Sequence, residues 1–434
     1  MNKLRNNITL FSLSLLFAVN FFGQSSTKLT YGSLSDVGLD SVKIYSKVDS
    51  MMTLGIENNA FPGAQVLVAK KGKIVFHEAY GFHTYDSVKK VNLNDVYDLA
   101  SVTKVLGPSL PIMKLVGEGR MDLDIPFYNF WEPWMNDKSK KDLTLREILA
   151  HQAGLKSYIV FLAEVLKKGK PKHRYIRTSY SKKYNQQVND SLYINKNFHN
   201  KIYRKINKST VKNDKKYVYS GLSFLLYPQI ITDITSTEYT NYLSENFYEP
   251  LGLNSLTYNP KAKKSNQSFI PTEKDTLFRH TTVNGYVHDE NASLFGGVSG
   301  NAGLFSNAND LAVIMQMLMQ YGHYNGKQYL REKTVKEFTS VQYPENDNRR
   351  GLGFDKPLLN NSELPLSEAY PAPEVSPESF GHSGFTGTFV WADPTHELVF
   401  IFLSNRVYPT RANRNLYNLN IRPALQQVFY TETN

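Results

Sequence analysis

The alternation of apolar and polar residues predicts strands near both ends of the chain and helices between them. Two apolar stretches, Ala64–Ala69 and Ile74–Tyr80, flank the turn Lys70–Lys73 and predict a β-hairpin. Near the other end, Thr388–Trp391 and Leu398–Leu403 predict two more strands. In a compact domain the strands of the two ends would pair in one antiparallel sheet flanked by helices, which predicts an α+β fold.

Apolar residues at helical spacing predict the helices. Val42, Tyr45, Val48 and Met52 predict an amphipathic helix before the hairpin. A helix is predicted after Ser101, and the prolines within it predict a bend or interruption. Further helices are predicted over 143–149, with Thr144 and Glu147 as a capping box, and over 217–231, 239–248, 309–319 and 421–430.

The first residues are typical of a secretory signal peptide. Lys3 and Arg5 precede an apolar run from Ile8 to Phe22, which is short for a membrane span. We therefore expect residues 1–23 to be cleaved and residues 24–434 to form the mature domain, in the periplasm or outside the cell. An uncleaved N-terminal anchor is the alternative. No later stretch is long and apolar enough for a transmembrane span.

Composition and charge narrow the function. The chain has no cysteine, which excludes disulfides, thiolate nucleophiles and Cys-ligated zinc. The segment from Lys156 to Lys216 holds 17 Lys and Arg against three acidic residues, a net charge of +14, which leaves −3 for the rest of the chain's total of +11. Because the basicity belongs to one segment, we do not expect a nucleic-acid-binding protein.

This basic segment, at about 156–216, is predicted to be an insertion in the domain. It is rich in Lys, Asn and Tyr and has few aliphatic clusters after Leu166, so we expect it to contribute little to the core. A solvated basic flap and a surface that binds anionic partners are the two alternatives.

Ser101-Val102-Thr103-Lys104 is the stretch around which we expect the chemistry to be organised. In the first turn of a helix, positions i and i+3 share a face, so the Ser101 hydroxyl and the Lys104 amine would meet. A serine with a basic neighbour suits a nucleophile. The same spacing occurs at four other serines, but those lie in more polar surroundings. The alternative is that Ser101 is an ordinary helix N-cap.

Three motifs follow in order: Ser-Val-Thr-Lys at Ser101, Tyr-Ser-Gly at Tyr219 and His-Ser-Gly at His382. With the hairpin and the terminal strands, they resemble the class C β-lactamase-like serine hydrolases, which include β-lactamases, penicillin-binding D,D-peptidases and family VIII carboxylesterases. Six further stretches resemble signatures of one branch of this superfamily, the periplasmic β-lactamase-domain hydrolases. They are ILAHQAGL, YEPLGL, VHDENA, GGVSGNAGLFS, GHSGFTGT and LSNRVYPTRAN. The resemblance covers nearly the whole mature chain. It implies a β-lactamase/transpeptidase-like fold with a mainly helical subdomain.

The resemblance also implies a role for each matching residue. Ser101 would be the nucleophile that is acylated, and Lys104 would take or relay its proton. Tyr219 matches the tyrosine that acts as general base and then as proton donor to the leaving group. His382 matches the lysine or histidine that opens the third motif, with a structural histidine as the alternative. The backbone N–H groups of Ser101 and Phe385 would form the oxyanion hole.

Substrate contacts are implied at Ser383, Gly384, Asn405 and Arg406. The last two would hold a substrate carboxylate, or alternatively lie at a surface strand end. The expected substrate is a small molecule or a peptidoglycan-derived compound, and the resemblance implies neither a metal nor another cofactor.

The chain departs from the family pattern at Gly221, where lactamases have an asparagine that contacts the lysine and the substrate amide. Its absence, together with a neutral His382, favours esters over β-lactams and D-Ala-D-Ala termini. We therefore expect a secreted serine hydrolase with an acyl-enzyme on Ser101, more an esterase than a β-lactamase. The alternative is a non-catalytic penicillin-binding or muropeptide sensor, or an interaction scaffold.

Overall fold

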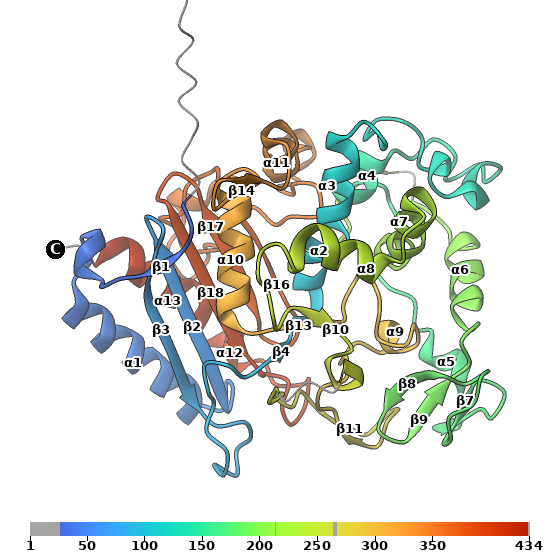
Figure 1. Cartoon of the computed structure of the whole chain (residues 1–434), viewed down its shortest axis with the longest axis horizontal. Coiled ribbons are helices and arrows are strands. Elements are labelled where there is room, and N and C mark those ends of the chain that lie inside the picture. The colour runs from blue at the N-terminus through green and yellow to red at the C-terminus, as the bar shows by residue number, and fades with distance from the viewer. Residues whose placement is uncertain (1–26, 213, 264–266, 433–434) are drawn as a thin grey trace, which may run out of the picture.

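The computed structural model describes residues 27–212, 214–263 and 267–432, and the predicted signal peptide lies outside these ranges. A sheet with helices on both faces lies beside a mainly helical region (Figure 1). Within the described ranges, no helix is long and apolar enough to cross a membrane.

The main sheet joins the two ends of the chain. Its six strands, in spatial order, are β1 (Thr30–Tyr31), β3 (Lys73–Gly81), β2 (Gly63–Lys70), β18 (Leu398–Ser404), β17 (Phe389–Asp393) and β16 (Phe380–Ser383). β2 and β18 pair antiparallel from Ala64↔Ser404 to Lys70↔Leu398. The predicted α+β fold and its terminal strands are thus confirmed. The exception to the antiparallel prediction is the short β1, which runs parallel to β3.

Both faces of this sheet are buried. In β18, Phe400 and Phe402 pack with α1 (Ser41–Glu57) and α13 (Ile421–Thr431), whereas Ile401 and Leu403 face the opposite core. α10 (Ala308–Met319) covers that second face (Figure 1). Alternate residues of one strand point to opposite faces, which is why β18 is apolar at every position from Leu398 to Leu403.

The buried side of α1 differs from the prediction. Val48 and Met52 are buried as expected, but Val42 and Tyr45 are exposed, at 79% and 41%. Ile44 takes their place, because Ile44, Val48 and Met52 recur every four residues and form one stripe along the helix.

The helical region contains most of the remaining helices. They are α2 (Thr103–Leu106), α3 (Ser109–Gly117), α4 (Leu145–Leu149), α7 (Tyr227–Thr235), α8 (Tyr239–Leu243), α9 (Glu290–Ser293) and α11 (Glu332–Thr339). The short α12 (Asn415–Asn418) packs against α13 instead. The predicted interruption after Ser101 is confirmed, since Gly107 and Pro108 separate α2 from α3. The predicted capping box of Thr144 and Glu147 is also confirmed.

Short strands complete the fold. They are β4 (Tyr97–Asp98), β10 (Thr257–Tyr258), β11 (Lys274–Asp275), β12 (Thr281–Thr282), β13 (Leu304–Ser306), β14 (His323–Tyr324) and β15 (Lys327–Gln328). β4, β10 and β13 form a three-stranded sheet, and β4 ends two residues before Ala100.

The helix predicted over 217–231 begins later than expected. A single 3₁₀ turn covers Ser223–Leu225, and α7 starts at Tyr227. Pro228 fits the first turn of α7, where its missing N–H leaves no gap in the hydrogen bonding. The residues around Tyr219 are irregular instead, because Val218 N–H bonds the His151 carbonyl and Gly221 N–H bonds the Ser157 carbonyl.

The expectation that the basic segment contributes little to the core is wrong. The segment folds into α5 (Leu162–Val165), β5 (Leu166–Lys167), β6 (Lys170–Pro171), β7 (Ile176–Arg177), β8 (Gln186–Asn189), β9 (Leu192–Ile194) and α6 (His199–Asn207). Ile176, Ile194, Ile202 and Ile206 are at most 1% exposed and belong to the main core. Single apolar residues spaced among lysines supply this buried side, so no aliphatic cluster is visible in the sequence.

Candidate active site

The turn before Ser101 is held in an unusual backbone conformation. Ala100 has a φ of +45°, a left-handed value that costs free energy in an L-residue. Its N–H donates to Asp98 Oδ1 at 2.8 Å, and the His288 N–H donates to Asp98 Oδ2 at 2.6 Å. Burial raises the pKa of the Asp98 carboxyl. Asp98 thus fixes the turn that presents Ser101 at the entrance to α2.

Ser101 and Lys104 meet as the sequence predicts. Lys104 Nζ donates to Ser101 Oγ at 2.9 Å and to the Asn301 carbonyl at 3.0 Å, and the lysine is 2% exposed. Its ammonium lies 5.2 Å from the Tyr219 ring centre and 5.6 Å from that of Phe224. Within the described residues Lys104 forms no ion pair, so its amine is directed at the serine by a carbonyl and two rings.

Tyr219 stands over His151. The two ring centres are 4.6 Å apart, and the Tyr219 hydroxyl is buried with no hydrogen-bond partner among the described residues. His151 Nδ1 accepts the Ser220 N–H at 3.2 Å, which assigns the ring proton to Nε2. Burial lowers the pKa of His151 well below its usual value. The Tyr219 hydroxyl and the His151 Nε2–H therefore both lack a hydrogen-bond partner among the described residues.

His382 is neutral and oriented by Arg350. Arg350 Nη2 lies 3.1 Å from His382 Nε2, and because arginine only donates, Nε2 must accept. Nδ1 therefore carries the proton and donates to the Ser383 carbonyl at 2.7 Å. Burial and the Arg350 charge lower the pKa of His382 to about 3. His382 and Tyr219 have their ring centres 6.1 Å apart.

Arg350 is the main residue that sequence reasoning missed. It is 2% exposed, pairs with Asp355 at 2.9 Å, and lies 5.4 Å from the Tyr219 ring centre. Arg349 pairs with the same carboxylate at 2.7 Å. Arg350 stands 32 positions before His382 and in none of the three motifs, so no local signal identifies it. The sequence indicated His151 only as one residue of the stretch ILAHQAGL and gave it no role of its own.

The loop that carries Phe385 is fastened to the turn before Ser101. Thr386 Oγ1 donates to the Asp98 carbonyl at 2.7 Å, and Thr388 Oγ1 donates to the Leu99 carbonyl at 3.1 Å. A Cβ on Gly384 would lie 2.5 Å from the Leu99 oxygen, so only glycine allows this approach. Phe385 itself is 44% exposed. The structure thus brings the two predicted oxyanion donors onto one connected pair of turns.

Asn405 and Arg406 lie inside the protein, and their contact with substrate stays a prediction. They are 1% and 0% exposed. Asn405 Nδ2 donates to the carbonyls of His83 and Pro271. The Arg406 guanidinium lies 4.4 Å from the Phe385 ring centre and supports that loop from below. This burial contradicts the alternative of a surface strand end. Ser383 is half-buried beside His382, and Gly384 is buried beside Phe385.

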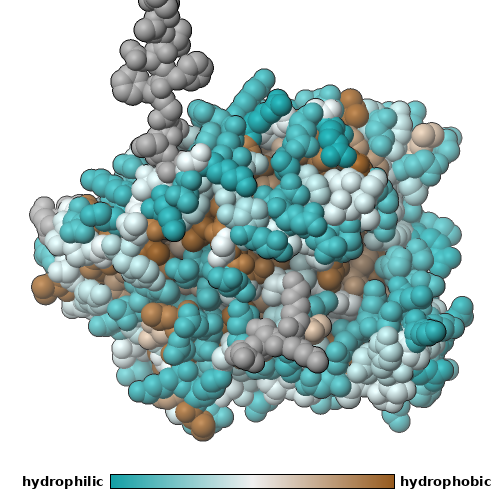
Figure 2. Space-filling model, in the orientation of Figure 1, coloured by the Kyte–Doolittle hydropathy of each residue, from teal (hydrophilic) through white to brown (hydrophobic). Residues whose placement is uncertain are grey.

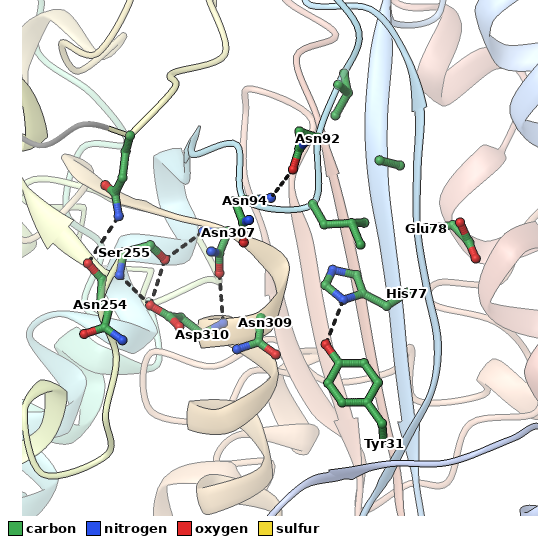
Figure 3. A pocket seen from close by; sticks show the side chains of 14 residues that line it. Tyr31, His77, Glu78, Asn92, Asn94, Asn254, Ser255, Asn307, Asn309 and Asp310 are labelled. Carbon is green, nitrogen blue, oxygen red and sulfur yellow. Dashed lines mark hydrogen bonds between the residues drawn. The ribbon is translucent and has the colours of Figure 1, made fainter.

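A separate pocket of about 800 Å³ lies between β3 and the start of α10 (Figure 3). Its lining includes Tyr31, His77, Asn92 and Asp310 and none of the residues of the three motifs. Asp310 is already bound by the N–H and hydroxyl of Ser255. In the part of the chain that the structure describes, no group of three His, Asp or Glu residues could hold a metal ion.

Comparison with known proteins shows the family of this chain. The model of the family described as Beta-lactamase matches residues 48–422. The chain belongs to the β-lactamase family. A Salmonella gallinarum protein named "Putative D-alanyl-D-alanine carboxypeptidase" is 29% identical to this family member over 453 residues, with 94% of each chain covered.

Solved structures confirm the fold of this β-lactamase family member. A penicillin-binding protein homologue from Caulobacter crescentus superposes with a TM-score of 0.63 at 18% identity, covering 90% of this chain and 99% of the other. EstCE1, described as a hydrolase with promiscuous acyltransferase activity, gives a TM-score of 0.63 at 15% identity, covering 88% and 98%. The predicted β-lactamase/transpeptidase-like fold is therefore confirmed.

Proposed function

We propose that the protein is a serine hydrolase that works through an acyl-enzyme on Ser101. The observation that carries this proposal is the 2.9 Å hydrogen bond from the buried Lys104 amine to the Ser101 hydroxyl. Membership of the β-lactamase family supports it. The alternative of an ordinary helix N-cap does not explain a lysine that is buried against the hydroxyl.

The proposed reaction has two steps. Ser101 Oγ attacks the carbonyl carbon of an ester or amide, and its proton passes by way of Lys104 and Tyr219 to the leaving oxygen or nitrogen. A water molecule then attacks the acyl carbon, gives its proton back to Ser101 Oγ and releases the acid. The N–H groups of Ser101 and Phe385 would stabilise the oxyanion in both steps. His382 would stay neutral throughout.

We propose that esters are preferred to β-lactams. Gly221 offers no side chain to bind a substrate amide, and an absent hydrogen bond to a buried partner costs about 1–3 kcal/mol. An activated ester needs less help from the enzyme, because its leaving group departs more easily. We expect a higher kcat/KM for p-nitrophenyl acetate or butyrate than for nitrocefin. The reverse order would contradict the ester preference while leaving the nucleophile assignment intact.

A D-alanyl-D-alanine carboxypeptidase is the second candidate, and Arg350 is the observation that favours it. A neutral His382 cannot attract a substrate carboxylate, but the guanidinium bonded to its Nε2 carries a full positive charge. The Salmonella relative is named for this activity. Release of D-alanine from a peptide ending in D-Ala-D-Ala, measured beside ester hydrolysis, decides between the two.

Replacement of Ser101 tests the core of the proposal. Ser101→Ala should abolish covalent labelling by a fluorophosphonate and lower kcat at least about 10³-fold. Ser220→Ala is the matched control, because its hydroxyl donates to the Lys156 carbonyl and takes no part in the proposed steps. Full activity of the Ser101 variant would overturn the assignment. A fluorescent penicillin adduct that is never released would indicate a sensor.

We further propose that residues 1–23 direct secretion and that residues 24–434 act as one domain outside the cytoplasm. The mass of the protein recovered from the periplasm or medium of an expressing cell tests this directly. A full-length mass on a membrane fraction would favour the uncleaved anchor.

A further inference from the structure

Two basic side chains of the segment 156–216 lie over the Tyr184 ring, and two further basic residues are joined to the same turn by backbone groups. Arg177 and Lys183 lie over the Tyr184 ring, with their charged groups 5.4 and 5.8 Å from its centre. The Tyr184 hydroxyl donates to the Arg174 carbonyl at 3.0 Å, and the Lys196 N–H bonds the Lys183 carbonyl. Arg174, Arg177, Lys183 and Lys196 are all exposed. We call these four cations, with Tyr180 and Tyr184, the Tyr184 surface.

The charge of this surface is not balanced by the protein. Of the 17 Lys and Arg in the segment, only Lys201, Lys205 and Lys215 form ion pairs within the described ranges. None of the four cations of the Tyr184 surface has an acidic partner there. Like charges on one surface repel one another, so this arrangement of cations does not by itself stabilise the fold. Their apolar neighbours, in contrast, are buried in the core, so the cations face outward.

An exposed aromatic ring adds a second kind of contact. Tyr180 is 66% exposed and meets Tyr193 edge to face, with ring centres 6.0 Å apart and planes at 82°. Tyr193 is paired with Arg177 between β9 and β7, which places Tyr180 beside the cations. Figure 2 shows hydrophilic residues over the right-hand edge of the molecule, where β7–β9 and α6 lie in Figure 1.

We propose that the Tyr184 surface binds an anionic polysaccharide. The cations would pair with the carboxylate groups of the polymer and release its counterions, and the Tyr180 ring would pack on the apolar face of a sugar. This binding lies outside the hydrolytic site and does not depend on its chemistry. Binding would hold the enzyme close to an acidic polymer. The substrate would be part of that polymer or lie next to it.

Other polyanions fit the surface less well. Tyr180 is the only exposed large hydrophobic residue among the described residues from 161 to 212, so there is no apolar wedge to enter a lipid bilayer. Tyr180 and Tyr193 stand edge to face, so they offer no parallel platform on which successive bases could stack.

Binding to polygalacturonate tests the proposal with two variants of equal net charge. The surface variant carries Arg174→Gln, Arg177→Gln, Lys183→Gln and Lys196→Gln. The control carries Lys90→Gln, Lys138→Gln, Lys141→Gln and Lys333→Gln, four exposed lysines elsewhere. Each set lowers the net charge from +11 to +7. We expect the surface variant to lose at least about tenfold in affinity and much of its salt dependence, and the control to stay within about threefold.

A single variant isolates the aromatic contact. Tyr180→Ala should weaken polygalacturonate binding about fivefold or more and leave binding to inorganic polyphosphate, which has no sugar face, unchanged. Melting temperature and p-nitrophenyl acetate hydrolysis should match the parent protein in every variant. The proposal would be overturned by equal losses of affinity in the surface and control variants, or by no binding of the parent protein to polygalacturonate at 50 mM salt. Tighter binding of single-stranded DNA or of phosphatidylglycerol vesicles than of polygalacturonate would also overturn it.

Discussion

At the scale of single residues, Arg350 places a positive charge beside the third motif, which has a histidine at its first position. A lysine at position 382 would carry that charge itself, whereas His382 is held neutral by burial and by the adjacent guanidinium. The arginine charge lies beside the imidazole, 3.1 Å from Nε2, and is held by Asp355. The hydrogen bond from Arg350 also fixes the tautomer of the imidazole.

The pH dependence of activity follows from this pair. With a pKa of about 3, His382 stays neutral from pH 5 to 8 and gives no limb to the profile of kcat/KM in that range. Arg350→Gln removes one of the causes that lower the pKa of His382, but burial, the larger cause, remains. The pKa of His382 should therefore rise while staying below its reference of about 6.5, and the activity of the variant should begin to fall at a higher pH than that of the parent as the imidazole is protonated.

Arg349→Gln is the matched control for this prediction, because it keeps the Arg350–His382 hydrogen bond while removing the other partner of Asp355. The measurement is kcat/KM for p-nitrophenyl acetate as a function of pH, for the parent and both variants. Three profiles of the same shape would show that Arg350 does not control His382.

Gly221 is a second position where one side chain should change the reaction. A Cβ built on Gly221 meets only the Asn301 Cβ, at 3.8 Å, and the backbone there needs no left-handed φ. Gly221→Asn should therefore fold normally and place an amide near Lys104. We expect nitrocefin turnover to rise relative to ester turnover, roughly 5- to 150-fold if the new bond acts in the transition state. An unchanged ratio in a protein with the parent's melting temperature would show that Gly221 does not set the preference.

At the scale of elements, the sequence predicts what depends on local pattern. Apolar runs identify β2, β3 and β18, Thr144 and Glu147 identify the start of α4, and the three motifs identify Ser101, Tyr219 and His382 as candidates. Arg350 and the Asn301 carbonyl could not be predicted, since they reach the site through tertiary packing and, in the second case, through a backbone atom. Burial of Asn405 and Arg406 is likewise a property of the packed loop and not of the motif.

The basic segment shows the same limit, and it leads to a prediction. Replacement of residues 167–212 by a short Gly/Ser linker should abolish cooperative melting, because it removes Ile176, Ile194, Ile202 and Ile206 from the main core. Ile202→Ala alone should lower the free energy of unfolding by about 2–5 kcal/mol, measured in urea. Lys168→Ala, on the exposed side, should change it by less than about 0.5 kcal/mol. A folded linker variant with the parent's melting temperature would show that the segment is dispensable.

At the scale of the whole molecule, buried neutral histidines couple stability to pH. Burial lowers the pKa of His77 to about 4, that of His382 to about 3, and that of His151 well below its usual value. The unfolded chain titrates at about 6.5 at each of these positions. Between pH 6.5 and 4.5 the unfolded state therefore binds protons that the folded state does not, and the free energy of unfolding falls as the pH is lowered.

Urea unfolding at pH 7.5 and 5.0 measures this effect. The carboxyls of Glu273 and Asp355, whose pKa values are lowered to about 2, protonate in the unfolded chain only near pH 4.5 and below, so they add little above pH 5. Each neutral histidine contributes up to about 1.4 kcal/mol per pH unit below 6.5, and we expect a total loss of about 2–5 kcal/mol. His77→Gln should remove one proton from the uptake and flatten the dependence, because glutamine does not titrate. Stability that is constant or rises toward pH 5.0 would show that these imidazoles are charged in the folded protein.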